Sequence, residues 1–326
     1  MIALISRMTA LAFAGLAVVA ISPTTSFADE DGALKVTATV PVGKFPAGVA
    51  VNPRSGNVYV ANGMSGTVSV INGRTNTVTA TVTVGGALGG IAVNPETDTV
   101  YVTNETSNTV AVIDGRTNTV EATVPVGLGP FGVAVNPRTG NAYVSDSGAG
   151  AVSVINEWTN TVTATVTVGA RPFDVAVNPR TGSVYVANSG NGTVSVIDGQ
   201  TNTVTATVTV GGLLPGVAVN PETCRVYVTN GTSNTVAVID GRTNTVETTV
   251  SVAGFPGLVA VNPRTGTIYV TSGANSSVEA IDGRTNTVES TATVGAAPFA
   301  VAVDPRGGKV YVANERSGTV SVLTTH

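Results

Sequence analysis

The chain has 326 residues, with 16 basic and 20 acidic side chains, a formal net charge of −4 and a single cysteine, Cys224. This mild acidic balance argues against a nucleic-acid partner, because binding to a phosphate backbone depends on clustered cations. One cysteine, far from the N-terminus, excludes an internal disulfide and a lipid anchor at a cleavage site. Stability must therefore come from packing and strand pairing.

The first 28 residues have the pattern of a secretory signal peptide. One cation, Arg7, precedes an apolar run over residues 11–21, and the small residues Ser26 and Ala28 precede the expected cleavage point. The apolar run is shorter than the ~20 residues that span a membrane, and no later segment is a better candidate. We expect cleavage after Ala28, a short tail over residues 29–33, and a secreted, periplasmic or cell-surface protein without a transmembrane segment.

From residue 34 onward the chain repeats itself with a step of 42 residues. A period near 40 with strand-like patterns, and without the 3.6-residue apolar spacing of helical repeats, is typical of propeller blades. In the first copy, strands are expected at residues 49–51, 58–60, 67–71 and 78–84, because turns rich in Asn, Pro and Gly separate them. Seven tyrosines mark the copies: Tyr59, Tyr101, Tyr143, Tyr185, Tyr227, Tyr269 and Tyr311.

The two ends of the repeat region complement each other. Residues 36–43 match the fourth strand of a blade but precede the first complete copy, whereas the last copy stops at Leu323 after its third strand. Pairing these ends would close a ring and remove both exposed sheet edges. The sequence predicts an all-β, seven-bladed β-propeller over residues 34–323, with four-stranded antiparallel blades, a ring closed by the N-terminal strand and a C-terminal tail at 324–326.

Two copies spell YVTN literally, at residues 101–104 and 227–230, and the others read YVAN, YVSD or YVTS. With these motifs the chain resembles the YVTN family of β-propeller repeat proteins, found in archaeal surface-layer proteins and in many exported bacterial proteins. The resemblance covers residues 34–323 and implies the propeller fold. It implies no particular activity, because the shared motif of that family is structural.

Metal and cofactor motifs receive simpler explanations from the sequence. An aspartate precedes glycine in several turns, where its carboxylate is expected to accept N–H groups of its own turn. The segment Gly127–Gly132 fits GxGxxG, but a strand follows it instead of the helix that would hold a pyrophosphate. We therefore predict no metal and no cofactor. The aspartates concerned are Asp114, Asp198, Asp240 and Asp282.

Charged turns and the lone histidine offer little for catalysis. Eleven cations in the turns after the first and third strands are balanced by nine acids, so solvated turn charges are expected there. The only histidine is the last residue, His326, and no catalytic residue is predicted. Trp158, in an outer turn, is either a partner contact or an ordinary isolated surface residue.

The loops before each first strand and after each second strand vary most between copies. We call the face that they form the mouth face, and the opposite face the turn face. Function requires difference between blades, so we predict the ligand-binding residues on the mouth face: Phe131, Asp146, Arg171, Phe173 and Asp174. The alternative for the aromatic rings is that they act as hydrophobic wedges between blades. Phe45, Phe255, Phe299, Glu105 and Glu315 lie in the same loops.

The sequence favours an exported, non-catalytic binding or scaffold propeller whose partner is a protein, a glycan or a small molecule. One alternative is a lactonase-like or lyase-like propeller enzyme that uses carboxylates and Arg171 at the mouth, because the lyases of this architecture need a histidine that the chain lacks there. Another is a structural component of a surface array, which the family resemblance also allows.

Overall fold

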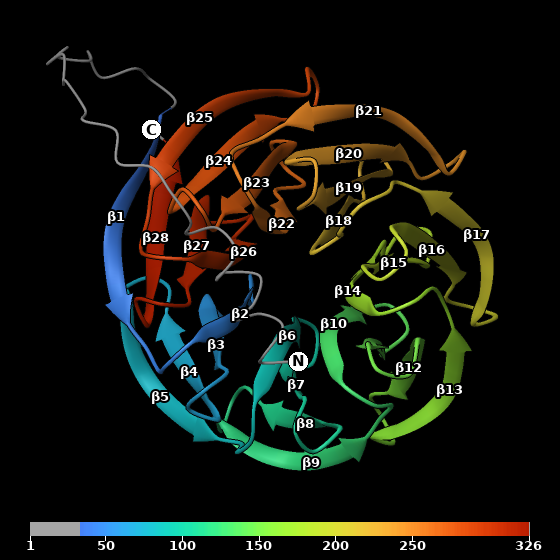
Figure 1. The fold of residues 1–326 in the computed structure, drawn as a ribbon. Helices are drawn as coiled ribbons and strands as arrows, with labels where there is room; N and C mark the ends of the chain where they lie inside the picture. The colour runs from blue at the N-terminus through green and yellow to red at the C-terminus, as the bar shows by residue number, and fades with distance from the viewer. Residues whose placement is uncertain (1–32, 326) are drawn as a thin grey trace, which may run out of the picture.

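The computed structural model describes residues 33–325, which form 28 β-strands and no helix. The strands make seven four-stranded antiparallel sheets arranged as blades around a central axis (Figure 1), which confirms the predicted seven-bladed propeller. Residues 1–32 and 326 lie outside the described residues. The predicted signal peptide and most of the predicted N-terminal tail over residues 29–33 therefore lie outside them too. Between residues 33 and 325, no helix is long and apolar enough to cross a membrane.

Each blade runs from an innermost strand at the axis to an outermost strand at the rim. Blade 1 contains β2 (Pro46–Val51), β3 (Asn57–Asn62), β4 (Thr67–Asn72) and β5 (Thr77–Thr83). Blade 2 contains β6 (Leu88–Asn94), β7 (Thr99–Asn104), β8 (Thr109–Asp114) and β9 (Thr119–Pro125). Blade 3 contains β10 (Pro130–Asn136), β11 (Asn141–Asp146), β12 (Ala151–Asn156) and β13 (Thr161–Thr167). Blade 4 contains β14 (Pro172–Val177), β15 (Ser183–Asn188), β16 (Thr193–Asp198) and β17 (Thr203–Thr209).

The remaining blades follow the same order. Blade 5 contains β18 (Val217–Asn220), β19 (Arg225–Asn230), β20 (Thr235–Asp240) and β21 (Thr245–Ser251). Blade 6 contains β22 (Pro256–Val261), β23 (Thr267–Ser272), β24 (Ser277–Asp282) and β25 (Thr287–Thr293). Blade 7 contains β26 (Pro298–Val303), β27 (Lys309–Asn314), β28 (Thr319–Thr325) and, as its outermost strand, β1 (Leu34–Pro41).

The N-terminal strand closes the ring, as predicted. β1 pairs antiparallel with β28, and Leu34 and Val40 on β1 are buried against blade 7. The strand therefore contributes apolar contacts as well as hydrogen bonds. The predicted end of the last strand needs a correction: Thr324 and Thr325 belong to β28 and not to a tail, because Lys35 and Leu34 stand opposite them.

The repeated tyrosine joins consecutive blades. Tyr59 of blade 1 packs with Val102 and Ile113 of blade 2, and its hydroxyl donates a 3.4 Å hydrogen bond to the carbonyl oxygen of Gly115. The core therefore lies in the seams, by which we mean the surfaces between consecutive blades. Equivalent hydrogen bonds run from Tyr143 to Gly199, from Tyr185 to Gly241 and, across the closing seam, from Tyr311 to Gly73.

The third residue of the YVTN motif also crosses the seam. The Thr103 hydroxyl donates a 2.7 Å hydrogen bond to the carbonyl oxygen of Phe131 on the innermost strand of the next blade. Ser145, Thr229 and Thr271 make the same kind of bond to Phe173, Gly257 and Phe299. Three seams lack this hydroxyl, because alanine stands at that position in blades 1, 4 and 7: Ala61, Ala187 and Ala313.

The asparagine that ends the motif fastens the loop arriving from the previous blade. Asn62 accepts a 3.0 Å hydrogen bond from the Gly43 N–H, and its amide nitrogen donates to the Ser69 hydroxyl at 2.9 Å. Asn104 holds its loop by donating to the carbonyl oxygen of Gly85 at 2.9 Å. The motif residues thus explain the fold, and they place variable loops on one face of a rigid ring.

Candidate binding site at the mouth of the propeller

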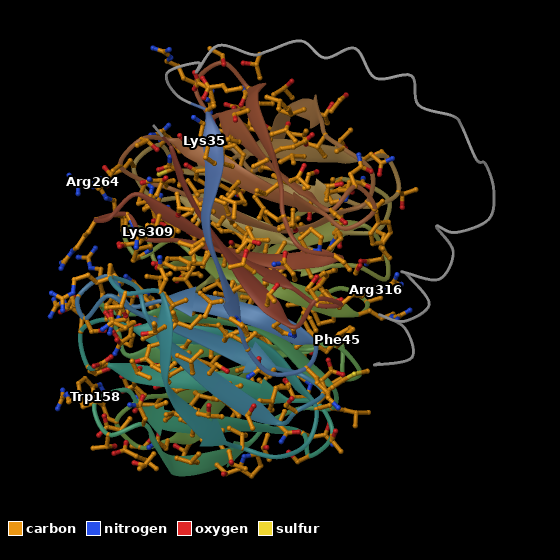
Figure 2. The ribbon with its side chains drawn as sticks, turned by 90° about the vertical axis from the view of Figure 1, so that its left-hand side faces the viewer. Lys35, Phe45, Trp158, Arg264, Lys309 and Arg316 are labelled. Atoms are coloured by element: carbon orange, nitrogen blue, oxygen red, sulfur yellow. The ribbon has the colours of Figure 1, made fainter. Side chains whose placement is uncertain are left out.

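The two faces of the ring carry different kinds of side chain. Phe45 and Arg316 lie at the mouth face, whereas Trp158, Arg264 and Lys309 lie at the turn face (Figure 2). The mouth loops connect the outermost strand of one blade to the innermost strand of the next, so their side chains surround the axis. The predicted ligand-binding residues all belong to these loops or to the strand ends beside them.

Three phenylalanines meet at the axis. The rings of Phe131 and Phe173 stack with centroids 3.9 Å apart, and Phe299 meets each of them edge-on at 6.2 Å. They come from β10, β14 and β26, which reach the centre of the ring from different sides (Figure 1). Phe45 packs against this cluster, which we call the aromatic plug.

The aromatic plug contains two of the predicted ligand-binding residues and accounts for their burial. Phe131 is 1% exposed and Phe173 is 6% exposed, because their rings cover each other. The rings also reach neighbouring blades, as the wedge alternative expects: a Cβ on Gly89 of blade 2 would lie 3.2 Å from the Phe131 ring, and Phe299 packs against the core cluster of the closing seam. Only the half-buried members, Phe45 and Phe299, present aromatic surface at the edge of the plug.

Asp146 occupies the repeat position of the motif asparagine and is fully buried. It accepts a 2.6 Å hydrogen bond from the Ser153 hydroxyl, while its Oδ1 atom has no hydrogen-bond partner among the described residues. Burial raises the pKa of this carboxyl to about 6, although the hydrogen bonds from Ser153 and from the Gly127 N–H oppose the rise. Asp146 therefore fastens the mouth loop of blade 3 from beneath.

Asp174 lies in the seam between blades 4 and 5. Its carboxylate accepts a 2.9 Å hydrogen bond from the Val217 N–H at the start of β18, and burial raises its pKa to about 7. Blades 1, 2, 3 and 5 have glycine at this repeat position, where an added Cβ would press on the next innermost strand. Asp174 thus forms a polar link in a seam that lacks the motif hydroxyl.

Arg171 is the one predicted site residue that is exposed. Within residues 33–325 it forms no ion pair with Asp174 or Asp146, so the three charged residues do not converge on one cluster. Its backbone has a φ of 51°, in the left-handed region that L-residues rarely adopt. Arg171 is thus an exposed cation in the mouth loop of blade 4.

Two repeat positions that the sequence analysis did not pair determine the shape of the mouth. The first precedes the innermost strand, and the second follows the motif asparagine; the backbone N–H of the second donates to the carbonyl oxygen of the first in all seven blades. Phenylalanine or leucine at the first position accompanies glycine at the second, alanine accompanies glutamate, and arginine or glycine accompanies serine. The pairs are Phe45 with Gly63, Ala87 with Glu105, Gly129 with Ser147, Arg171 with Ser189, Leu213 with Gly231, Phe255 with Gly273 and Ala297 with Glu315.

This exchange of size indicates that the two positions share one volume. A Cβ added to Gly231 would lie 3.6 Å from the Leu213 side chain and 3.5 Å from the Phe255 ring of the next blade. At these two positions each blade therefore contributes at most one large side chain to the mouth. Aligning the repeats at these two positions would have revealed the pattern from the sequence.

The two glutamates at the second position have strongly perturbed carboxyl groups. Burial raises the pKa of Glu105 to about 7 and that of Glu315 to about 8. Glu315 is 4% exposed, and its Oε1 atom has no hydrogen-bond partner among residues 33–325. A buried carboxyl oxygen without a hydrogen-bond partner is costly. Asp146 shares this feature at its Oδ1 atom, but its other oxygen accepts a hydrogen bond from Ser153.

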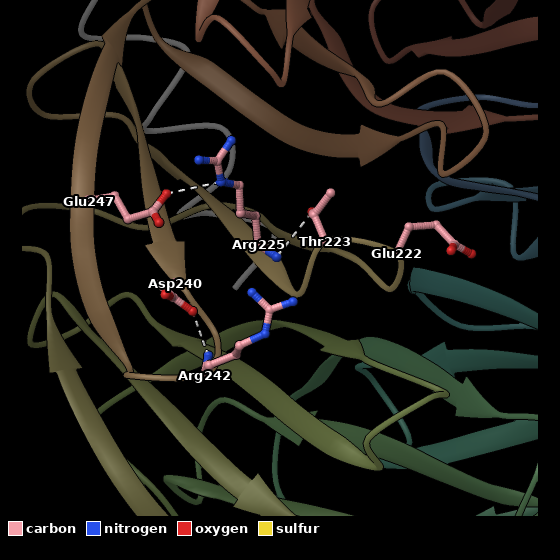
Figure 3. Close-up of a pocket in the computed structure, with 6 residues that line it drawn as sticks. All are labelled: Glu222, Thr223, Arg225, Asp240, Arg242 and Glu247. Atoms are coloured by element: carbon pink, nitrogen blue, oxygen red, sulfur yellow. Dashed lines mark hydrogen bonds and ion pairs between the residues drawn. The ribbon is translucent and has the colours of Figure 1, made fainter.

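The turn face carries a hollow of about 400 Å³ on blade 5, lined by charged residues (Figure 3). Arg225 is engaged there, because its Nε lies 3.0 Å from a Glu247 oxygen and its Nη1 donates to the carbonyl oxygen of Gly283. Other turn-face charges link successive blades, as Arg180 does with Glu222 at 2.5 Å. The remaining lining residues are Glu222, Thr223, Asp240 and Arg242.

The turn aspartates make the local hydrogen bonds expected of them. Asp114 and Asp198 each accept a 2.7 Å hydrogen bond from the backbone N–H two residues further along, and Asp240 and Asp282 do the same. Among the described residues, no group of three or more His, Cys, Asp or Glu side chains is arranged to hold a metal ion. Trp158 is 73% exposed on this face.

Seven four-stranded blades, a closed ring and a variable mouth define the chain as a β-propeller repeat protein. Its sequence matches the YNCE-like beta-propeller family over residues 31–141 and 138–301, and the chain belongs to that family. No curated protein matches it. A solved structure of hydrazine synthase from Kuenenia stuttgartiensis is similar, with 21% identity, coverage of 86% of this chain and 96% of that chain, and a TM-score of 0.80. At that identity the likeness concerns the fold alone.

Proposed function

We propose that this chain is an exported, non-catalytic binding or scaffold propeller of the YVTN type, whose partner contacts the mouth face. The turn face repeats nearly the same residues in every blade, and many of its charges are engaged within or between blades. The mouth face differs from blade to blade. A single asymmetric partner is therefore better accommodated at the mouth.

The observation that carries this proposal is backbone strain at the mouth. Phe45, Arg171 and Phe255 have φ angles of 55°, 51° and 54°, although each precedes a proline and carries a large side chain. A non-glycine residue in this conformation costs roughly 1–2 kcal/mol. Gly129 adopts a φ of 65° at the same repeat position without that cost. Large side chains kept in a strained conformation support a hypothesis of function at that position.

The composition of the mouth favours a protein partner. Met64 and Leu128 are 59% and 60% exposed in the mouth loops of blades 1 and 3. Together with the half-buried rings of Phe45 and Phe255 and the exposed Arg171, they supply the aromatic, methionine and arginine side chains that are enriched in protein interfaces. Glycans and small molecules are the competing ligand classes.

The test compares two effects of one substitution: relief of the backbone strain and loss of the side chain that contacts the partner. Arg171→Gly should raise the stability of the protein by roughly 1 kcal/mol, because it relieves the left-handed backbone, and it should abolish partner binding. Ala297→Gly relieves the same conformation but removes only a methyl group, so it should keep binding. Peptides, envelope fragments, glycans and metabolites would be screened by thermal shift against the intact protein and both variants.

Two results would contradict the proposal. One is a partner whose binding is unchanged in Arg171→Gly and Phe255→Gly. The other is a partner whose binding survives those changes but is lost when Arg116, Arg242 and Arg284 are replaced, since that pattern assigns the site to the turn face.

A further inference from the structure

The neighbours of Glu315 follow from the internal repeat. In blade 5, a Cβ on Gly231 would lie between Leu213 of its own blade and Phe255 of the next blade. Glu315 holds the same repeat position in blade 7, where the corresponding neighbours are Ala297 and Phe45. By this correspondence, Phe45 is the residue of blade 1 that faces the Glu315 position across the closing seam.

The repeat also relates Glu315 to a second aromatic residue. A Cβ on Gly63, at this repeat position in blade 1, would lie 3.6 Å from the Cβ of Ala47. In blade 7 the residue that corresponds to Ala47 is Phe299. Phe45 and Phe299 are the two half-buried members of the aromatic plug, so the repeat correspondence relates Glu315 to the accessible edge of the plug.

Glu315 also lacks a complete set of partners. Its Oε1 atom accepts no hydrogen bond from residues 33–325, although the side chain is 4% exposed. The charged residues on the adjoining segments are Arg316, the next residue in the chain, and the exposed Lys44 on the loop that leads to β2. Attraction from Arg316 opposes the effect of burial on the pKa of the Glu315 carboxyl without overcoming it.

From this arrangement we infer that the mouth binds a primary ammonium group at the seam between blades 7 and 1, with Glu315 as the anionic partner and Phe45 and Phe299 as aromatic walls. A carboxylate supplies the charge and the acceptor that an ammonium group needs, and aromatic faces attract cations through their quadrupole. The inference deepens the proposed function and rests on it, because it names the chemical group of the partner that enters the mouth: a lysine side chain or a chain N-terminus.

Binding of a cation must be linked to release of a proton. With a pKa of about 8, Glu315 is mostly protonated at pH 6 and pH 7, and the ammonium group favours its ionised form. Affinity should therefore rise about tenfold between pH 6 and pH 7, as for any ligand that requires one group to be deprotonated. The rise should flatten above pH 8. A neutral ligand of the same shape should show no such dependence.

The experiment uses the secreted protein and butylammonium chloride, with affinity measured by ligand-observed NMR at several pH values and constant ionic strength. Saturable binding at pH 8 is expected, with the pH dependence described above. Glu315→Gln keeps the shape of the side chain and should lower the affinity about tenfold or more while flattening the pH profile. Phe45→Leu should weaken binding several-fold and leave the pH profile unchanged.

The matched control is Glu105→Gln. Glu105 holds the same repeat position in blade 2, but Gly129 stands where Phe45 flanks Glu315, so an aromatic wall is missing there. The affinity of this variant should stay within about twofold of the unaltered protein. The melting temperature of each variant verifies that it is folded.

Three results would overturn the inference: no saturable binding of butylammonium, equal binding of neutral butanol, or an unchanged affinity and pH profile in Glu315→Gln. A peptide with a free N-terminal amine and an acetylated peptide with one lysine distinguish the two sources of the ammonium group. If butylammonium fails to bind while Arg171→Gly still abolishes binding of a partner from the screen, the ammonium inference fails and the mouth-face proposal stands.

Discussion

Asp146→Asn should stabilise the protein at neutral and alkaline pH, although it removes a charged residue from a predicted binding face. Five other blades have asparagine at this repeat position. In blade 4, the Asn188 amide nitrogen donates to the Ser195 hydroxyl at 2.9 Å. The asparagine introduced by this change would meet Ser153 in the same way, and its side-chain oxygen would accept from the Gly127 N–H as Asn62 accepts from Gly43.

The size of the effect follows from the carboxyl group. Its pKa is about 6 in the folded chain against an ordinary value of 3.8, which corresponds to roughly 3 kcal/mol against ionisation in the folded state. The folded state therefore binds the proton more tightly than the unfolded state does. The stability contribution of Asp146 is full at pH values below about 4, falls as the pH rises, and is lost above about pH 6.

The assay compares melting temperatures of the unaltered protein and Asp146→Asn at pH 4, 6 and 8. The difference should be near zero at pH 4 and should favour the variant by about 1–3 kcal/mol at pH 8, or on the order of 2–6 °C. Shifts that come from Asp174, Glu105 and Glu315 are common to both proteins and cancel in the comparison. Asn188→Asp is the reverse control and should destabilise blade 4 at pH 8 but not at pH 4.

Two outcomes would refute this reasoning. An advantage of Asp146→Asn that is equal at pH 4 and pH 8 would mean that ionisation does not contribute. A loss of stability at pH 8 would mean that the carboxylate is stabilised in the folded chain, contrary to its burial and its unpartnered Oδ1 atom.

Three further predictions test the seams, the closure and the export of the chain. Tyr101→Phe should leave the melting temperature unchanged or raise it, because the Tyr101 hydroxyl is buried without a partner among residues 33–325. Tyr143→Phe should cost about 1 kcal/mol of stability, because it removes the hydrogen bond to Gly199. Equal losses of stability in both variants would contradict this difference between the two hydroxyl groups. Deleting residues 34–41 should cost several kcal/mol, since it removes buried Leu34, buried Val40 and the pairing with β28, and an unchanged melting temperature would exclude β1 as the closing strand. N-terminal sequencing of the secreted protein should begin at Asp29, and a retained leader in a membrane fraction would contradict the proposed export.

The fold was predictable because every blade repeats the same pattern of strand and turn residues. Apolar and β-branched residues alternate between turns rich in asparagine and glycine, and the constant step of 42 residues leaves one strand missing at the C-terminal end. Residues 36–43 supplied that strand by their likeness to residues 78–85. The exact end at Thr325 was missed, since the repeat pattern ends earlier and only pairing with Leu34 extends the strand.

The arrangement at the mouth was less predictable, because it depends on contacts between blades that a single repeat does not encode. Phe131, Phe173 and Phe299 share one repeat position, whereas Phe45 and Phe255 lie two residues earlier in theirs. The shared position turns inward and brings the three rings together at the axis. The earlier position adopts a left-handed backbone, and its residue in blade 1, Phe45, packs only against the edge of the plug.

The same difference separates the structural carboxyl groups from the candidate ligand-binding one. Asp146 replaces an asparagine that fastens a loop, and Asp174 replaces a glycine that faces the next blade, so each acquires a hydrogen bond from its surroundings. Glu315 replaces a residue that lines the mouth itself, and its Oε1 atom receives no such bond within the described residues. Comparison of each exception with the other six copies at its own repeat position therefore shows what that exception can do. By this comparison, the mouth of blade 7 is the part of the ring that we infer binds a cation.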